Sequence, residues 1–134
     1  MDNSILAYYQ AIKDGSEIVG RWILLLYTWI VKGLQDKAFF YDAKKANRAI
    51  NYVENFCRHH EGALAPQLIK LELWQKALTA IIFGIVDKTG FRQFREVCII
   101  VARKNGKTLL AAGIETYMAY AAGEYGSEIY FLAP

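Results

Sequence analysis

The feature that most constrains the fold is an apolar run that leads directly into a basic, glycine-containing loop. The run Val97-Cys98-Ile99-Ile100-Val101-Ala102 is largely β-branched, which is typical of a strand buried on both faces of a parallel sheet. After the loop, an alanine-rich helical pattern continues to about Gly123, and a second strand is predicted from Glu128 to Leu132. We therefore expect a βαβ unit with parallel strands in the last third of the chain.

The loop between the predicted strand and helix contains Gly106-Lys107-Thr108. Glycine lets backbone amides approach phosphate oxygens, lysine supplies a charge to the β and γ phosphates, and a threonine hydroxyl can bind Mg²⁺. The free amides and positive dipole end of the following helix favour the same ligand. The complete pattern G-x-x-x-x-G-K-[ST] has glycine where this sequence has Val101, but the order of strand, loop and helix favours ATP and Mg²⁺ as ligands over a chance turn.

The N-terminal part of the chain predicts helices. One runs from about residue 2 to 13 with Asn3 or Ser4 near its cap, and a second starts at a Ser16 cap, runs to about Val31 and is closed by Gly33. The second helix contains the run WILLLYTWIV, about half of the roughly 20 apolar residues that cross a bilayer. We expect this helix to be buried in the protein, with no membrane partner.

Two more helices are expected before the loop. One begins near Asp42 with an inward face, and the other extends from about Leu71 to about Gly84. The inward face comprises Ala43, Ala46, Ala49, Ile50, Val53 and Phe56. Residues 59–66 form a linker, which divides the chain into a helical region, 1–62, and a second region, 63–134. The predicted fold class is therefore α/β, a helical N-terminal region followed by a P-loop βαβ unit.

Charge and cysteine content permit few further conclusions. The 16 basic and 13 acidic residues give a net charge of +3, too even a balance to establish nucleic-acid binding. Cys57 and Cys98 lie far apart without a metal-ligand spacing, which favours reduced thiols in the cytosol.

The segment Val101-Ala-Arg-Lys-Asn-Gly-Lys-Thr108 resembles the deviant Walker A motif of tailed-phage terminase large subunits, the ATP-driven motors that pack DNA into procapsids. Residues 71–75 resemble the adenine-side segment of that family, and residues 90–96 resemble its lead into the first strand. The resemblance extends over about residues 35–134.

The resemblance implies roles for individual residues. Lys107 would bind phosphate, Thr108 would bind Mg²⁺, and Arg103 would act in cis as an arginine finger, with Lys104 as the alternative. Gln75 would recognise the adenine edge, supported by Trp74, and the implied nucleotide-binding set is Trp74, Gln75, Arg103, Lys104, Asn105, Gly106, Lys107 and Thr108. Plainer interpretations are a solvated arginine, a tryptophan of the helix core and a surface glutamine.

The resemblance also implies partners and limits. The parent protein would be an ATPase and endonuclease in the bacterial cytoplasm that works with double-stranded DNA, the small terminase subunit and the portal of the procapsid. The chain would be a truncated copy without the acidic strand end, the catalytic carboxylate and the nuclease domain, so it would bind nucleotide weakly and not hydrolyse it. We expect it to self-associate through its uncovered strands.

Two alternatives remain open. The chain could be a non-enzymatic interaction or DNA-binding module with a vestigial loop, for which Lys44, Lys45, Arg48 and Arg58 supply positive charge. It could also belong to another P-loop ATPase, such as a helicase-like protein.

Overall fold

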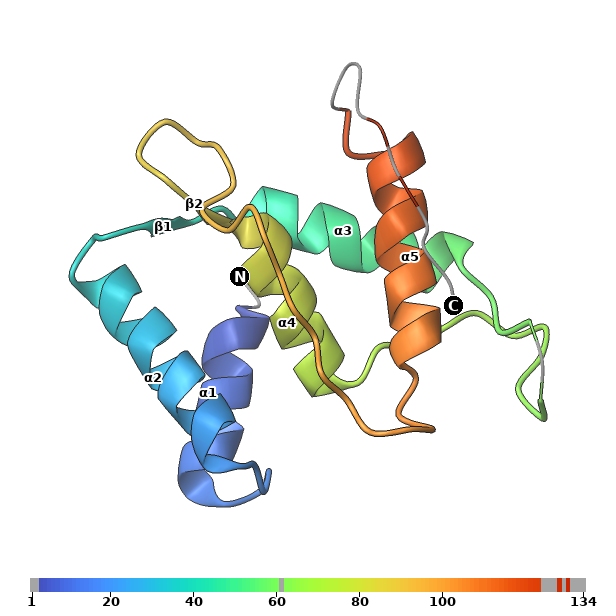
Figure 1. Cartoon of the computed structure of the whole chain (residues 1–134), viewed down its shortest axis with the longest axis horizontal. Coiled ribbons are helices and arrows are strands. Elements are labelled where there is room, and N and C mark those ends of the chain that lie inside the picture. The colour runs from blue at the N-terminus through green and yellow to red at the C-terminus, as the bar shows by residue number, and fades with distance from the viewer. Residues whose placement is uncertain (1–2, 61, 124–127, 129, 131–134) are drawn as a thin grey trace. The chain divides into compact units, whose positions relative to one another are not determined.

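A computed structural model describes residues 3–60, 62–123, 128 and 130. Within these residues the fold is mixed helical, with five helices and one two-stranded antiparallel sheet (Figure 1). The chain divides into two compact units, the first formed by Met1–Ile50 with Leu71–Cys98 and the second by Asn51–Lys70 with Ile99–Pro134. None of the described helices combines the length and the hydropathy that crossing a bilayer requires.

The first unit is built around helix α1, Ser4–Asp14, which packs against both α2, Arg21–Gln35, and α4, Leu73–Gly84 (Figure 1). Asn3 caps α1, because its side-chain oxygen accepts hydrogen bonds from the amides of the next turn at 3.1 and 3.2 Å. Gly15 ends the helix with φ at 83°, a conformation that glycine adopts without strain. Both ends of this helix confirm the sequence prediction.

Helix α2 begins later than predicted. Its N-cap is Gly20, and Ser16 instead donates its amide and its hydroxyl to the carboxylate of Asp14. Ser16 therefore belongs to the turn that follows α1. Gly33 lies inside α2, where the ring of Phe39 fills the space that a Cβ would need, so it does not end the helix.

The expected burial of α2 is wrong. Tyr27, Ile30 and Val31 are buried, and Tyr27 meets Tyr8 edge-to-face with ring centroids 4.9 Å apart. The opposite side of the helix is exposed, including Trp22 and Trp29. One neighbouring helix covers only one stripe of α2, which is apolar on almost all sides.

A short sheet follows α4. Strand β1, Phe40–Tyr41, pairs antiparallel with β2, Ile85–Val86, which directly continues from the end of α4. The prediction of a helix ending near Gly84 is confirmed, but neither two-residue strand was predicted. The close approach of this corner requires glycine at position 84, where a Cβ would lie 2.7 Å from that of Ala46.

The turn after β2 is organised by one carboxylate. Asp87 accepts hydrogen bonds from the amides of Thr89 and Phe91, at 2.8 and 3.1 Å, and from the Thr89 hydroxyl. Gly90 takes φ of 85° in this turn, and its carbonyl accepts a hydrogen bond from the Lys45 ammonium.

The second unit consists of the end of α3, Ala43–Phe56, and of α5, Lys107–Tyr120, with the segments beside them. Gly113 of α5 faces Val53 of α3, and Tyr117 packs on Tyr52 with centroids 5.5 Å apart. The predicted inward positions 46, 49, 50 and 53 of α3 are buried, but Phe56 is exposed because the helix ends there.

The parallel sheet predicted in the last third is not confirmed. Val97 to Ala102 form no strand, and Ile100 is 93% exposed. The second predicted strand, 128–132, lies largely outside the described residues, and Glu128 and Tyr130 are in no strand. A β-strand is defined by its hydrogen bonds to a neighbouring strand, and no described residue forms such a pair with residues 97–102. The apolar pattern alone therefore could not establish the sheet.

Candidate functional site

The loop that precedes α5 has an unusual backbone. Lys104 and Gly106 both adopt positive φ, 65° and 68°, whereas Asn105 between them does not. Alternation of this kind is typical of nests, in which successive backbone amides converge on an anion. The Asn105 side chain braces the loop, since its amide nitrogen donates to the carbonyl of Ala102 at 3.4 Å.

Lys104 carries strain in this arrangement. A non-glycine residue in the left-handed region costs on the order of 1–3 kcal/mol, and such residues concentrate at functional sites. Gly106 adopts the same region without a Cβ penalty. The loop therefore holds a conformation that its sequence does not favour at position 104.

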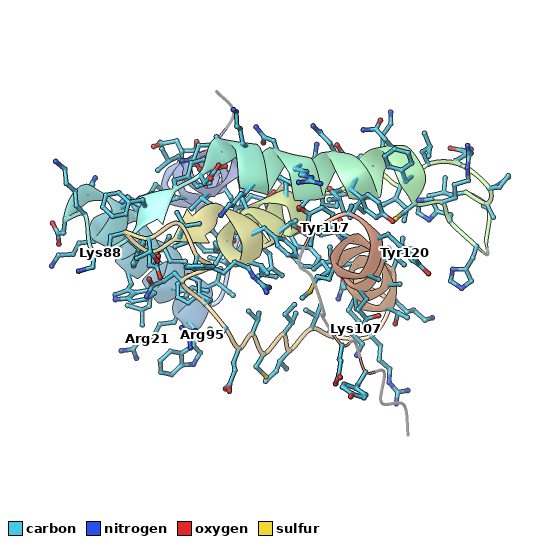
Figure 2. All side chains as sticks on the ribbon, turned by 90° about the horizontal axis from the view of Figure 1, so that it is seen from above. Arg21, Lys88, Arg95, Lys107, Tyr117 and Tyr120 are labelled. Carbon is cyan, nitrogen blue, oxygen red and sulfur yellow. The ribbon has the colours of Figure 1, made fainter. Side chains whose placement is uncertain are left out.

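Helix α5 begins at Lys107, immediately after this loop (Figure 2). Its N-cap, Gly106, has no side chain, and the first helical hydrogen bond runs from the amide of Leu110 to the Gly106 carbonyl at 3.0 Å. The backbone amides of the first turn are thus available to donate hydrogen bonds to a ligand. No acidic residue lies in this turn, so the positive end of the helix dipole is not offset there.

The charged and hydroxyl side chains of the loop are all accessible. Arg103, Lys104, Lys107 and Thr108 are exposed. Three cations therefore lie within five consecutive residues, beside the amides at the start of α5. This combination suits a polyanion such as a nucleoside triphosphate. Thr108 places a hydroxyl one residue into the helix, which suits a Mg²⁺ held beside such an anion.

The two residues predicted to bind the base lie in the other compact unit. Trp74 is half-buried and Gln75 is buried, both in the first turn of α4. The Gln75 side-chain oxygen accepts the amide of Glu72 at 2.9 Å, and the Glu72 side chain accepts the amide of Gln75 in return. Gln75 therefore forms a capping box, a role that the spacing of Glu72 and Gln75 could have revealed.

The structure thus brings together Arg103 to Thr108 in one loop and helix start, and Trp74 with Gln75 in one helix start. The positive φ of Lys104 had no sequence signal, because lysine gives no hint of a left-handed conformation. Among the described residues, no three Asp, Glu, His or Cys side chains gather as a metal site.

Comparison with known families identifies the part of the chain that contains this loop. Residues 73–134 match the family model described as terminase large subunit, ATPase domain. The match begins at the first residue of α4 and includes the loop and α5, so this part of the chain is similar to a terminase ATPase domain. Searches of curated proteins and of solved structures gave no significant match.

Proposed function

We propose that the chain binds ATP with Mg²⁺ through residues 103–108, as the nucleotide-binding part of a terminase ATPase. The observation that carries this proposal is the backbone of the loop, with Lys104 and Gly106 at positive φ directly before the uncapped start of α5. The similarity of residues 73–134 to a terminase ATPase domain supports the same ligand. The backbone conformation of the loop, its cationic side chains and the family match all favour a phosphate-containing ligand.

Each side chain of the loop has a distinct task in this proposal. Lys107 neutralises the β and γ phosphates, and the Thr108 hydroxyl binds the Mg²⁺ that bridges them. Arg103 stabilises the charge that develops on the γ phosphate, with Lys104 as the alternative. Asn105 and Gly106 contribute backbone amides.

We propose further that Trp74 and Gln75 contact the base. Gln75 would contact the base through its side-chain amide nitrogen, because its side-chain oxygen already accepts a hydrogen bond from the Glu72 amide. We also propose that the ATPase domain starts near residue 63. In that domain, residues 97–102 and 128–132 are parallel strands that precede and follow α5 in the sequence.

The proposed function of the whole family member is ATP-driven packaging of double-stranded DNA in the bacterial cytoplasm, with cleavage of that DNA and with the small subunit and portal as partners. Hydrolysis also requires an acid that holds Mg²⁺ and a group that orients the attacking water. The resemblance assigns neither role to a residue of this sequence.

The direct experiment is a titration of fluorescently labelled ATP against the chain in the presence of Mg²⁺. Lys107→Ala removes the phosphate charge and should weaken binding at least about tenfold, as expected for loss of a charge-assisted contact. Gly106→Val forces a β-branched residue into the left-handed region and should have a similar effect. The matched control is Lys88→Ala, an exposed lysine outside the loop.

Equal affinities for wild type, Lys107→Ala and Lys88→Ala would reject the loop as the site. Competition by tripolyphosphate separates the two parts of the proposal. If tripolyphosphate competes but Gln75→Ala leaves the ATP affinity unchanged, the phosphate site stands and the base contact is rejected.

A second candidate function is DNA binding by the helical part, which the surface of α3 favours. Lys44 and Arg48 are exposed one turn apart on this helix, whereas Lys45 donates to the Gly90 carbonyl and Arg58 to the Pro66 carbonyl at 3.0 Å. If these cations bind phosphates, duplex DNA should bind without nucleotide and weaken steeply with salt. The combination Lys44→Glu and Arg48→Glu should abolish that binding and leave ATP titrations unchanged, which distinguishes the two functions.

A further inference from the structure

The exposed side of α2 has a symmetric sequence. Trp22, Leu25, Leu26 and Trp29 are spaced i, i+3, i+4 and i+7, which places them on one face of the helix. We call these four residues the tryptophan face. The pattern W-x-x-L-L-x-x-W is the same in both directions, with its centre between Leu25 and Leu26. A surface of this kind is complementary to itself when a second copy approaches antiparallel.

Most of the tryptophan face is exposed in the described structure, although one side of Trp29 packs near Phe39 and Phe94. Trp22 is 79% and Trp29 52% exposed, and Leu25 and Leu26 are exposed to a similar degree as their neighbours Ile23 and Leu24. The four side chains of the tryptophan face together expose on the order of 500 Å² of apolar surface, more than half of the roughly 800 Å² that each partner contributes to a standard interface. An apolar patch of this size on a soluble protein typically marks an interaction site.

We propose that the tryptophan face is the interface of a two-fold symmetric dimer in which two α2 helices pack antiparallel. A closed two-fold interface requires the same patch on both copies, with each residue pairing with its symmetric counterpart. The axis passes between Leu25 and Leu26, so that Trp22 of one copy packs against Trp29 of the other, and Leu25 packs against Leu26.

The charges around the face agree with this orientation. Lys32 lies in the last turn of α2, and Glu17 precedes the helix. In the antiparallel pair, Lys32 of one copy lies at the same end as Glu17 of the other. Arg21 projects from the start of the helix with its guanidinium 6.0 Å from the centre of its own Trp22 ring (Figure 2). This dimer is independent of the nucleotide loop, since α2 lies in the other unit.

The test is sedimentation equilibrium of the 134-residue chain over a range of concentrations. The wild type should form a dimer, and Trp22→Glu should weaken dimerisation at least about tenfold, since buried tryptophans are common binding hot spots. The matched control is Phe91→Glu, the same kind of change at a comparably exposed aromatic residue of the same unit. It should leave the dimer intact.

Mixing experiments test the orientation. Trp29→Arg alone should also dissociate the dimer, but an equimolar mixture with Trp22→Glu should restore it, because the antiparallel arrangement brings the new opposite charges together. A parallel pair would separate positions 22 and 29 by two helical turns, so no recovery would occur. Because Trp29 also packs near Phe39 and Phe94, the far-UV circular dichroism of each variant is recorded first.

Three results would overturn the proposal. These are a wild type that is monomeric at every concentration, a dimer that Trp22→Glu leaves intact, and a mixture that stays monomeric while both variants are folded. Adsorption of monomeric wild type to neutral phospholipid vesicles, with a blue shift of its tryptophan emission, would identify a lipid surface as the occupant instead.

Discussion

At the scale of single residues, several polar side chains determine where elements begin and turn. Asn3, Asp14 and Asp87 each accept backbone amides close to them in sequence. Such contacts are local, so the sequence can predict them, but neighbouring candidates compete for the same role. Ser16 illustrates that competition, since the carboxylate of Asp14 engages the serine that would otherwise cap α2.

The cap of α1 gives a prediction about stability. Asn3→Ala removes the acceptor for the amides of Ile5 and Leu6 and should lower the free energy of unfolding by about 1 kcal/mol. Chemical denaturation measures this loss. Asn3→Ser keeps an acceptor at the cap and should recover most of the stability, and an equal loss in both variants would show that the cap is not the cause.

The turn after β2 gives a prediction about pH. The Thr89 hydroxyl, with backbone amides of the same turn, stabilises the charged form of Asp87 and holds the pKa of that carboxyl below its ordinary value. The carboxylate therefore stabilises the turn at pH above the ordinary aspartate pKa of about 4, and this contribution is lost as the pH falls through the lower, folded-state pKa. An NMR titration of the Asp87 side-chain carbon measures it.

Thr89→Ala removes the main donor in this turn. The pKa of Asp87 should then rise towards its ordinary value, while the amides of Gly90 and Phe91 show their pH-dependent shifts at correspondingly higher pH. An unchanged titration of Asp87 in this variant would mean that the hydroxyl makes no contribution.

At the scale of elements, small residues determine how closely helices approach. A Cβ on Gly113 would lie 3.1 Å from both methyl groups of Val53, so Gly113→Ala introduces crowding that outweighs the better helix propensity of alanine. We expect the free energy of unfolding to fall by about 1 kcal/mol. Thermal and urea denaturation of the purified variant measure the change.

The same contact can be tested by a double mutant. Val53→Ala removes the two methyl groups that crowd position 113, so adding Gly113→Ala to that variant should cost nothing or raise stability. Strictly additive effects of the two changes would contradict direct packing between these residues.

The helices were predictable largely because periodicity and caps are local. The sequence correctly predicts α1, α3, α4 and α5, and the buried positions 46, 49, 50 and 53 of α3. The exposure of α2 was not predictable. The run WILLLYTWIV shows that the helix is apolar on almost all sides, but it does not indicate how many neighbouring elements pack against it. Strands β1 and β2 comprise two residues each, too few for an alternating pattern.

The candidate site shows the same division. The position of Gly106, Lys107 and Thr108 at the start of a helix followed from the sequence, since α5 begins as the pattern predicts. The left-handed backbone at Lys104 did not, because lysine rarely adopts a positive φ. Whether residues 97–102 form a strand depends on a pairing partner, which no local pattern specifies.

At the scale of the whole molecule, α3 belongs to both compact units, whose boundary falls between Ile50 and Asn51 inside this helix. Helix formation is cooperative, so loss of one half of α3 should propagate into the other. All three tryptophans lie in the first unit, so their fluorescence reports on that unit alone. We predict that thermal melts followed by tryptophan fluorescence and by far-UV circular dichroism coincide.

Two proline substitutions test this coupling. Asn51→Pro interrupts α3 at the boundary and should separate the two melting curves, whereas the same change at Ser16, in the turn before α2, should leave them coincident. Separate transitions in the wild type would show that the units unfold independently.

The unpaired run from Val97 to Ala102 makes the backbone itself a reporter. Its amides have no strand partner, so they should exchange with deuterated solvent within seconds, far faster than the amides inside α4. If these residues acquire a neighbouring strand, the same amides become protected while the rest of the molecule is unchanged. Hydrogen exchange of the peptide that spans these residues, followed by mass spectrometry, would then show when the strand becomes paired. No nucleotide or activity assay is needed.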